Sequence, residues 1–87
     1  MMKPYANLLL IPIVITLAWE ASPTPDVTSY KLYARASTES AFHCISTMHR
    51  QLEVKITVDG RRNWFLYVTA KNSSGESAPS NIVYVPR

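Results

Sequence analysis

Residues 52–71 have the sequence Leu-Glu-Val-Lys-Ile-Thr-Val-Asp-Gly-Arg-Arg-Asn-Trp-Phe-Leu-Tyr-Val-Thr-Ala-Lys, which has the clearest strand pattern in the chain. Over residues 52–58 apolar side chains alternate with polar ones, which is the period of a strand with one face buried. Asp59-Gly60 is a turn dipeptide, and the alternation resumes over residues 64–71. The pattern therefore predicts two strands, joined either by a hairpin or by a loop that crosses between sheets.

The flanking segments show the same two-residue period. Apolar residues share one face of residues 13–19, and residues 36–49, which have no clear period, are interpreted as a loop around one short edge strand. Turn formers separate the strands, and Gly75 stands where a positive φ is expected. No segment has helical periodicity of useful length, so the sequence predicts an all-β, antiparallel sandwich of six or seven strands. The expected strands are 13–19, 30–35, 42–46, 52–58, 64–71 and 82–85, the last an edge strand because it follows Pro79.

Length and composition narrow the classes of protein. The chain has 87 residues, enough for one small domain. Its one cysteine, Cys44, excludes an internal disulfide and leaves no second cysteine for a zinc-finger pattern. Hydrophobic residues make up 47% and charged residues 17%, a balance that favours a folded chain over a disordered one. The net charge of +3 is spread along the chain, whereas nucleic-acid-binding proteins concentrate basic residues on one element, so we expect no nucleic acid among its partners.

The N-terminal segment, residues 1–12, allows two interpretations. Lys3 followed by the apolar run 8–18 has the outline of a secretory signal, with cleavage near Ala21. The run is too short for a comfortable membrane span, which needs about 20 residues, and we expect no membrane span. Cleavage would remove the strand that ends at Trp19, so we favour an uncleaved segment that belongs to the structure. It then provides an arm that adds a strand to the sheet edge of a neighbouring subunit, made of Leu8, Leu9, Leu10 and Ile11.

Three stretches carry a resemblance to a known family. They are Val14-Ile-Thr-Leu-Ala-Trp-Glu-Ala-Ser-Pro, Asp26-Val-Thr-Ser-Tyr-Lys-Leu-Tyr and Tyr67-Val-Thr-Ala-Lys-Asn-Ser-Ser-Gly-Glu-Ser-Ala-Pro-Ser-Asn. These resemble the B strand with its core tryptophan, the C strand, and the F strand, FG loop and G strand of the fibronectin type III domain. The resemblance covers about residues 13–85 and implies a seven-stranded immunoglobulin-like β-sandwich. The domain then occupies residues 13–87, after the N-terminal segment.

The resemblance also assigns single residues. Trp19 is the core tryptophan, and Val58 matches the leucine that precedes the family's E–F corner. Trp64 stands six residues before Ala70, where the family usually has a tyrosine whose hydroxyl ties down that corner, and Gly60 stands where the family often has proline. An indole N–H donates a hydrogen bond but does not accept one, so we expect a different tie at this corner. The family's A strand has no separate signature here, and we expect it to be missing, continuous with the B strand, or donated to a neighbouring subunit.

The sequence offers little for chemistry. His43, Cys44 and His49 are the candidates for a metal site, but they fall in the least regular segment and we interpret them as ordinary edge residues. Two glycines cannot build a phosphate-binding loop, and no Gly-x-Ser-x-Gly motif occurs. The carboxylates are scattered, with no marked catalytic pair. We therefore expect a protein that is not an enzyme and that needs no cofactor and no metal.

One predicted surface has more aromatic residues than a domain without a binding partner needs. In the family's layout the C and F strands share a sheet, and their residues that face away from the core include three aromatics flanked by cations. Aromatics and arginine are enriched at the centres of protein interfaces. The alternative is a group of surface aromatics that pair across strands without a partner. We interpret the group as a candidate contact face for a protein, or in second place for a glycan, and it consists of Lys31, Tyr33, Arg35, Phe65 and Tyr67.

These features predict a non-enzymatic structural or binding module. A lone sandwich of this kind, with no enzyme or second domain to space, is most useful as a repeated subunit that docks on a larger assembly. Small proteins that resemble fibronectin type III domains occur on bacteriophage particles, so we expect a head or tail component of a virion. The alternative is a secreted or cell-surface domain that serves adhesion or glycan binding.

Overall fold

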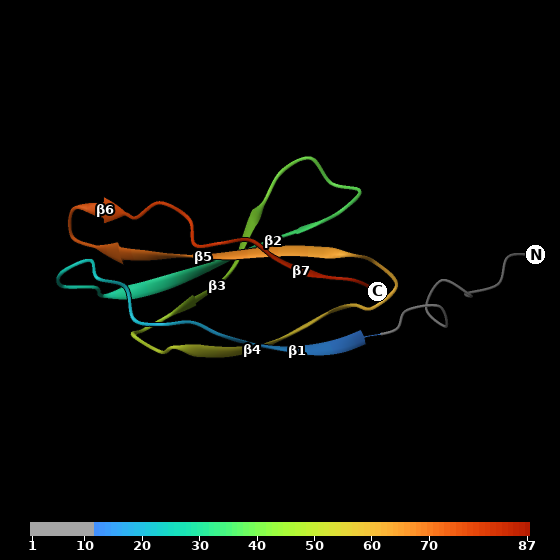
Figure 1. The fold of residues 1–87 in the computed structure, drawn as a ribbon, viewed down its shortest axis with the longest axis horizontal. Helices are drawn as coiled ribbons and strands as arrows, with labels where there is room; N and C mark the ends of the chain where they lie inside the picture. Colours follow the sequence, from blue (N-terminus) through green and yellow to red (C-terminus); the bar gives the residue numbers. More distant parts are fainter. Residues whose placement is uncertain (1–11) are drawn as a thin grey trace, which may run out of the picture.

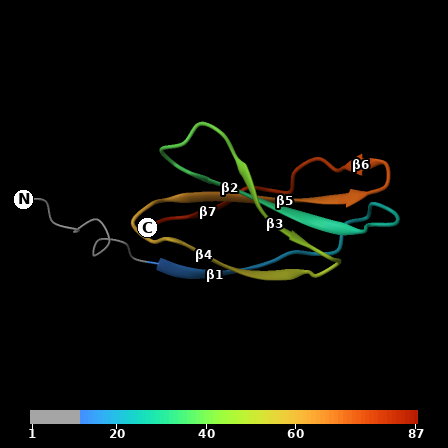
Figure 2. The same cartoon turned by 180° about the vertical axis from the view of Figure 1, so that it is seen from behind.

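A computed structural model of the chain describes residues 12–87. This part has no helix and forms seven strands in two antiparallel sheets, which stack as a β-sandwich (Figure 1, Figure 2). The all-β antiparallel fold expected from the alternating pattern is therefore confirmed. The strands are β1 (Pro12–Ala18), β2 (Ser29–Ala36), β3 (His43–Met48), β4 (Glu53–Asp59), β5 (Trp64–Asn72), β6 (Gly75–Glu76) and β7 (Val83–Val85).

The smaller layer contains β1 and β4 alone among the described strands. They pair antiparallel along the whole of both strands, with Ile15 opposite Ile56 at the centre. On β1, Ile13, Ile15 and Leu17 are half-buried while the residues between them are exposed, as the two-residue period predicts. Val54 and Ile56 of β4 are also half-buried, so both strands turn their apolar side toward the larger layer.

The larger layer has the strand order β3-β2-β5, with β6 and β7 both paired to the outer edge of β5. Its centre is the β2–β5 ladder, in which Leu32 lies opposite Val68 and Tyr33 opposite Tyr67. The register between β2 and β3 shifts between Leu32 and Tyr33, which marks a bulge. The predicted edge strand 42–46 is present with shifted bounds as β3, and it covers the other edge of β2.

The core belongs mainly to the larger layer. Leu32 of β2 and Leu66 of β5 are fully buried, and Met48 of β3 is nearly so. Trp19 packs against this cluster, with its ring 5.6 Å from that of Tyr30. By contrast, no residue of β1 or β4 reaches the same degree of burial. The two-stranded layer therefore contributes apolar contacts to the core while staying partly open to solvent itself.

The chain passes between the two layers after β4. Because β4 and β5 lie in different sheets, the turn at Asp59-Gly60 begins a crossing loop and not a hairpin. The Trp64 indole Nε1–H donates a 2.9 Å hydrogen bond to the backbone carbonyl of Asp59, which ties the two ends of this loop together. Arg61 completes the turn, with its backbone N–H and its guanidinium both bonded to the Asp59 carboxylate.

The last predicted strand, residues 82–85, is present as β7, and the structure has a further short strand, β6, before it. Between β6 and β7, the Oγ atoms of Ser77 and Ser80 accept hydrogen bonds from the backbone N–H groups of Ala70 and Val68. These side chains take the place of backbone carbonyls, so the ladder to β5 is interrupted around Pro79, which has no N–H to donate. Gly75, the first residue of β6, has a φ of 133°, the positive value expected for that glycine. The described part of the chain offers no helix that is long and apolar enough to span a membrane.

Candidate functional site

The outward surface of β2 and β5 gathers aromatic side chains from several strands. Tyr33 and Tyr67 are directly opposite, and their rings stack with centroids 4.9 Å apart and planes inclined by 15°. Phe42, from the loop before β3, meets Tyr67 edge-on at 4.7 Å, and Phe65 meets Tyr84 of β7 at 5.0 Å. These distances are those of favourable aromatic pairs. We call this surface the aromatic face and define it as Tyr33, Arg35, Phe42, Phe65, Tyr67 and Tyr84.

Arg35 is the cation of the aromatic face. Its guanidinium lies 4.7 Å from the centroid of Phe65 and 5.3 Å from that of Phe42, within the range of cation–π attraction. Its Nη1 also donates a 2.8 Å hydrogen bond to the backbone carbonyl of Glu39. The Glu39 carboxylate in turn accepts a 2.8 Å hydrogen bond from the N–H of Ala36. The charge of Arg35 is therefore held in one position by contacts on two sides.

Glu76, on β6, organises the other end of the face. Its Oε2 accepts hydrogen bonds from the Tyr33 hydroxyl at 2.7 Å and from the Thr69 hydroxyl at 2.8 Å, while its Oε1 lies 3.5 Å from Lys31 Nζ. Because a charged acceptor strengthens a hydrogen bond, the carboxylate fixes the orientation of the Tyr33 ring. Lys31 opposes Thr69 across the β2–β5 ladder, so the three donors converge on one carboxylate.

The same contacts displace two pKa values. The hydrogen bond to Glu76 raises the pKa of Tyr33 to about 12, with further contributions from desolvation and from the negative charge of Glu76. Conversely, the hydrogen bonds from Tyr33 and Thr69, together with the positive charge of Lys31, hold the pKa of Glu76 below its ordinary value. At neutral pH the pair is therefore a neutral phenol bonded to a carboxylate.

The structure brings together all five residues predicted for the contact face. Lys31, Tyr33, Arg35, Phe65 and Tyr67 lie on the outward surface of β2 and β5, and each is half-buried because its neighbours cover part of it. The arrangement is thus a packed aromatic surface and not a strip of free rings.

Three members of this region were not predicted from the sequence: Phe42, Glu76 and Tyr84. Phe42 lies in the aperiodic segment, and Glu76 and Tyr84 reach the face only through the pairing of β6 and β7 with β5. A partial signal existed for Tyr84, since it alternates with Val83 and Val85 in the last predicted strand. Thr69, two residues after Tyr67 on β5, is buried, and its hydroxyl donates a hydrogen bond to the Glu76 carboxylate.

The residues considered for chemistry are dispersed. His43 and His49 lie at opposite ends of β3, about 20 Å apart at the rise of an extended strand, which is too far to share one ion. Cys44 is exposed, and its Sγ lies 3.7 Å from the carbonyl of Ser46. Within residues 12–87 no three side chains of the His, Cys, Asp or Glu type gather as metal ligands.

The arm Leu8–Ile11, the second group of predicted site residues, lies outside the described residues. Comparison with known proteins adds no assignment for the rest of the chain. No model of a known protein family matches the sequence, and no curated protein matches it.

Proposed function

We propose that this protein is a non-enzymatic binding subunit that docks on a protein partner through the aromatic face. The observation that carries the proposal is the position of Arg35 over Phe65 and Phe42, beside the stacked pair Tyr33 and Tyr67. Arginine and tyrosine are the residue types that most often dominate interface energetics. Because these side chains are already held by one another, docking immobilises few rotamers, which lowers the entropic cost of association.

The resemblance to the fibronectin type III domain is part of this proposal. In that assignment β1 and β4 are the B and E strands, and β3, β2, β5 and the divided β6–β7 are the C′, C, F and G strands. Two features support it: the pairing of β1 with β4 apart from the β3-β2-β5 sheet, and the packing of Trp19 against the core. The Trp64 bond to the Asp59 carbonyl then replaces the family's tyrosine tie.

A protein partner is favoured over a glycan because neighbouring side chains already cover the flat faces of these rings. Sugars stack on free aromatic faces, but here Tyr33 and Tyr67 cover one another and Arg35 covers Phe65. The face presents ring edges, one cation and hydroxyl groups, which suit a polar and aromatic protein surface. We therefore infer that the chain is a repeated subunit of a larger assembly, such as a head or tail component of a phage virion, and we place a secreted adhesion or glycan-binding domain second.

The experiment compares variants of the tagged full-length chain in the organism that encodes it, with the mass of the purified complex as the readout. Tyr84→Ser and Arg35→Glu alter the aromatic face, and Lys55→Ala, on the exposed side of β4, is the matched control. We expect the two face variants to lose the complex while their circular dichroism stays that of the parent, and the control to keep it. A complex of unchanged mass and yield in both face variants would contradict docking through this surface.

A further inference from the structure

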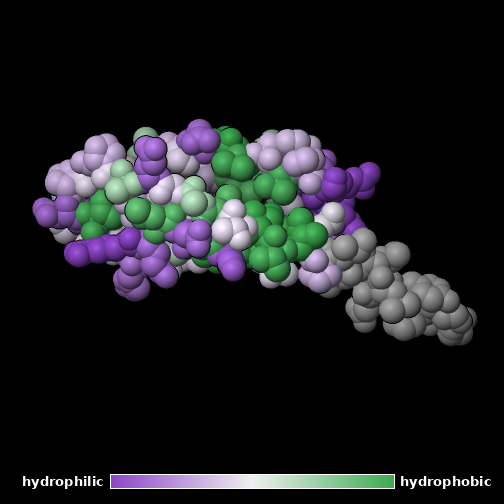
Figure 3. Space-filling view, turned by 60° about the horizontal axis from the view of Figure 1, so that its bottom comes forward, coloured by the Kyte–Doolittle hydropathy of each residue, from purple (hydrophilic) through white to green (hydrophobic). Residues whose placement is uncertain are grey.

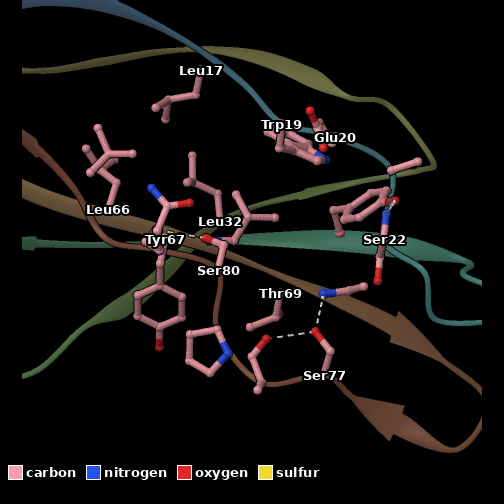
Figure 4. Close-up of a pocket in the computed structure, with 18 of the residues that line it drawn as sticks. Leu17, Trp19, Glu20, Ser22, Leu32, Leu66, Tyr67, Thr69, Ser77 and Ser80 are labelled. Atoms are coloured by element: carbon pink, nitrogen blue, oxygen red, sulfur yellow. Dashed lines mark hydrogen bonds between the residues drawn. The ribbon is translucent and has the colours of Figure 1, made fainter.

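A groove opens between the two layers beside β1. It has a volume of about 560 Å³, and its walls come from the end of β1, the middle of β5 and the segment between β6 and β7 (Figure 4). Leu17 and Trp19 line one side, and Leu66, Val68 and Val83 line the other. Glu20 is the one charged residue among those that line it. The groove therefore suits an uncharged, largely apolar occupant.

The last two residues of β1, Leu17 and Ala18, line the groove, and the edge of β1 that is unpaired among the described strands leads up to it. The N–H of Trp19 donates to the carbonyl of Leu52, so the odd-numbered residues of β1 direct their backbone groups toward β4. The N–H and C=O groups of Val14, Thr16 and Ala18 consequently point to the opposite edge, where no other described strand pairs with them. This edge is a template for one more strand.

The two edges of the small layer differ in how well they are protected against pairing with a further strand. Glu53, Lys55 and Asp59 place charges along β4, a common device that discourages further strand pairing. By contrast, β1 carries no charged residue, and Val14 is 66% exposed. Figure 3, in which the lower layer of Figure 1 turns toward the viewer, shows hydrophobic side chains gathered over the middle of the molecule and hydrophilic ones around its ends.

We propose that the free edge of β1 and the adjoining groove bind the arm Leu8–Ile11 of a second copy of this chain as an added antiparallel strand. The inference rests on the proposed role of the chain as a repeated subunit, and it names the partner of this second surface. Four apolar residues without charge match an apolar groove, and backbone bonds to Val14, Thr16 and Ala18 set the register. Alternate arm residues enter the groove, and the others cover Val14 on the outside.

The sequence around Pro12 favours an arm from a second copy over the chain's own arm. Pro12 and Ile13 are already extended and paired with β4, so a hairpin would have to reverse within residues 8–11. Two-residue hairpins need glycine, asparagine or aspartate at positive φ, and this stretch contains leucine and isoleucine alone. Ile11 precedes a proline, which restricts it to the extended region. These sequence features favour pairing of the arm with the edge of another copy over pairing with the edge of its own chain.

The test is disulfide cross-linking between two populations of full-length protein with Cys44→Ser as background. One population carries Leu8→Cys or Leu10→Cys, and the isotope-labelled other carries Val14→Cys or Thr16→Cys, both exposed positions. The matched control is Lys55→Cys, which lies beside Thr16 on the same side of the layer but one strand farther from the bound arm. That extra strand puts it about 9 to 10 Å from the arm, beyond the reach of a disulfide.

We expect a mixed dimer of one labelled and one unlabelled chain, formed roughly a hundredfold faster than with Lys55→Cys, because pairing holds the arm cysteine within disulfide reach of position 14 or 16 but not of position 55. Equal rates with the control would overturn the proposal. A disulfide closed within a single chain that carries both cysteines would overturn it as well, as would an intact mass that lacks the arm. If cross-linking fails while Tyr84→Ser and Arg35→Glu still lose the complex, this inference falls and the proposed function stands.

Discussion

The hydroxyl of Tyr33 donates a 2.7 Å hydrogen bond to Oε2 of Glu76, and this contact joins the aromatic face to the short strand β6. Tyr33 also stacks on Tyr67, so the position of one carboxylate is transmitted to the centre of the face. Lys31 and Thr69 hold that carboxylate from two other directions. The face is thus organised by a polar network at one end and by Arg35 at the other.

Replacing Glu76 by glutamine should weaken the hydrogen bond that raises the pKa of Tyr33. The neutral amide removes the negative acceptor, so the pKa of Tyr33 should fall from about 12 toward its ordinary value of 10.0. Ultraviolet titration of tyrosinate checks this, with Tyr33→Phe identifying which part of the curve belongs to this ring. An unchanged titration curve in Glu76→Gln would show that the hydrogen bond does not control Tyr33.

The same pair predicts how stability depends on pH. The pKa of Glu76 is lowered in the folded state, so its contribution is present above its ordinary value near 4.5 and is lost as pH falls through the lowered pKa. The pKa of Tyr33 is raised, so its contribution is present below pH 10 and is lost as pH rises toward about 12.

The free energy of unfolding, measured by urea denaturation across this pH range, should therefore have a plateau and fall at both acid and alkaline pH. We call these two falls the acid limb and the alkaline limb. Glu76→Gln should flatten the alkaline limb and reduce the acid limb. Asp59 keeps part of the acid limb in the variant, because its hydrogen bonds to Arg61 lower its pKa too. Parallel curves for the parent and the variant would be inconsistent with the network.

The Trp64 indole gives a test of the crossing loop between β4 and β5. Trp64→Phe removes the donor to the Asp59 carbonyl, whereas Trp64→Tyr supplies a hydroxyl that is able to donate there. We expect the tyrosine variant to keep roughly 1 kcal/mol more of the free energy of unfolding than the phenylalanine variant. Chemical denaturation measures both, and equal values would mean that packing of the ring and not its N–H secures the loop.

The position of the core predicts that two leucine-to-alanine substitutions will differ greatly in their effect on the free energy of unfolding. Leu32 is fully buried, so Leu32→Ala should lower the free energy of unfolding by about 2 to 5 kcal/mol. Leu52 lies just before β4 and is 41% exposed, so Leu52→Ala should cost far less. Thermal and urea unfolding of the two variants provide the comparison. A similar loss in both would contradict a core centred on β2 and β5.

Strand periodicity was enough to predict most of the fold. The alternation on either side of Asp59-Gly60 predicted β4 and β5, and the run from residue 13 predicted β1, because one face of each strand must be apolar to pack. The interruption between β6 and β7 was not predictable in this way. It depends on Ser77 and Ser80 placing their hydroxyl groups against β5, and sequence period carries no information on such contacts.

The candidate site was predictable to the extent that it follows from strand alternation. Once β2 and β5 are neighbours, Tyr33 and Tyr67 must share a face. Phe42 and Glu76 come from a loop and from a two-residue strand, so their approach depends on tertiary packing. The hydrogen bond from Thr69 to Glu76 depends on that packing as well.

We propose that this chain works as a repeated subunit joined to its partners by surface contacts. Native mass spectrometry of the protein isolated from its source tests it most directly, since one spectrum gives both the mass of each chain and the mass of the complex. We expect chains of 9.8 kDa, with the arm present, within a larger oligomer or particle. A monomer that lacks about twenty N-terminal residues would contradict it, because both the arm and the strand β1 would then be absent from the working protein.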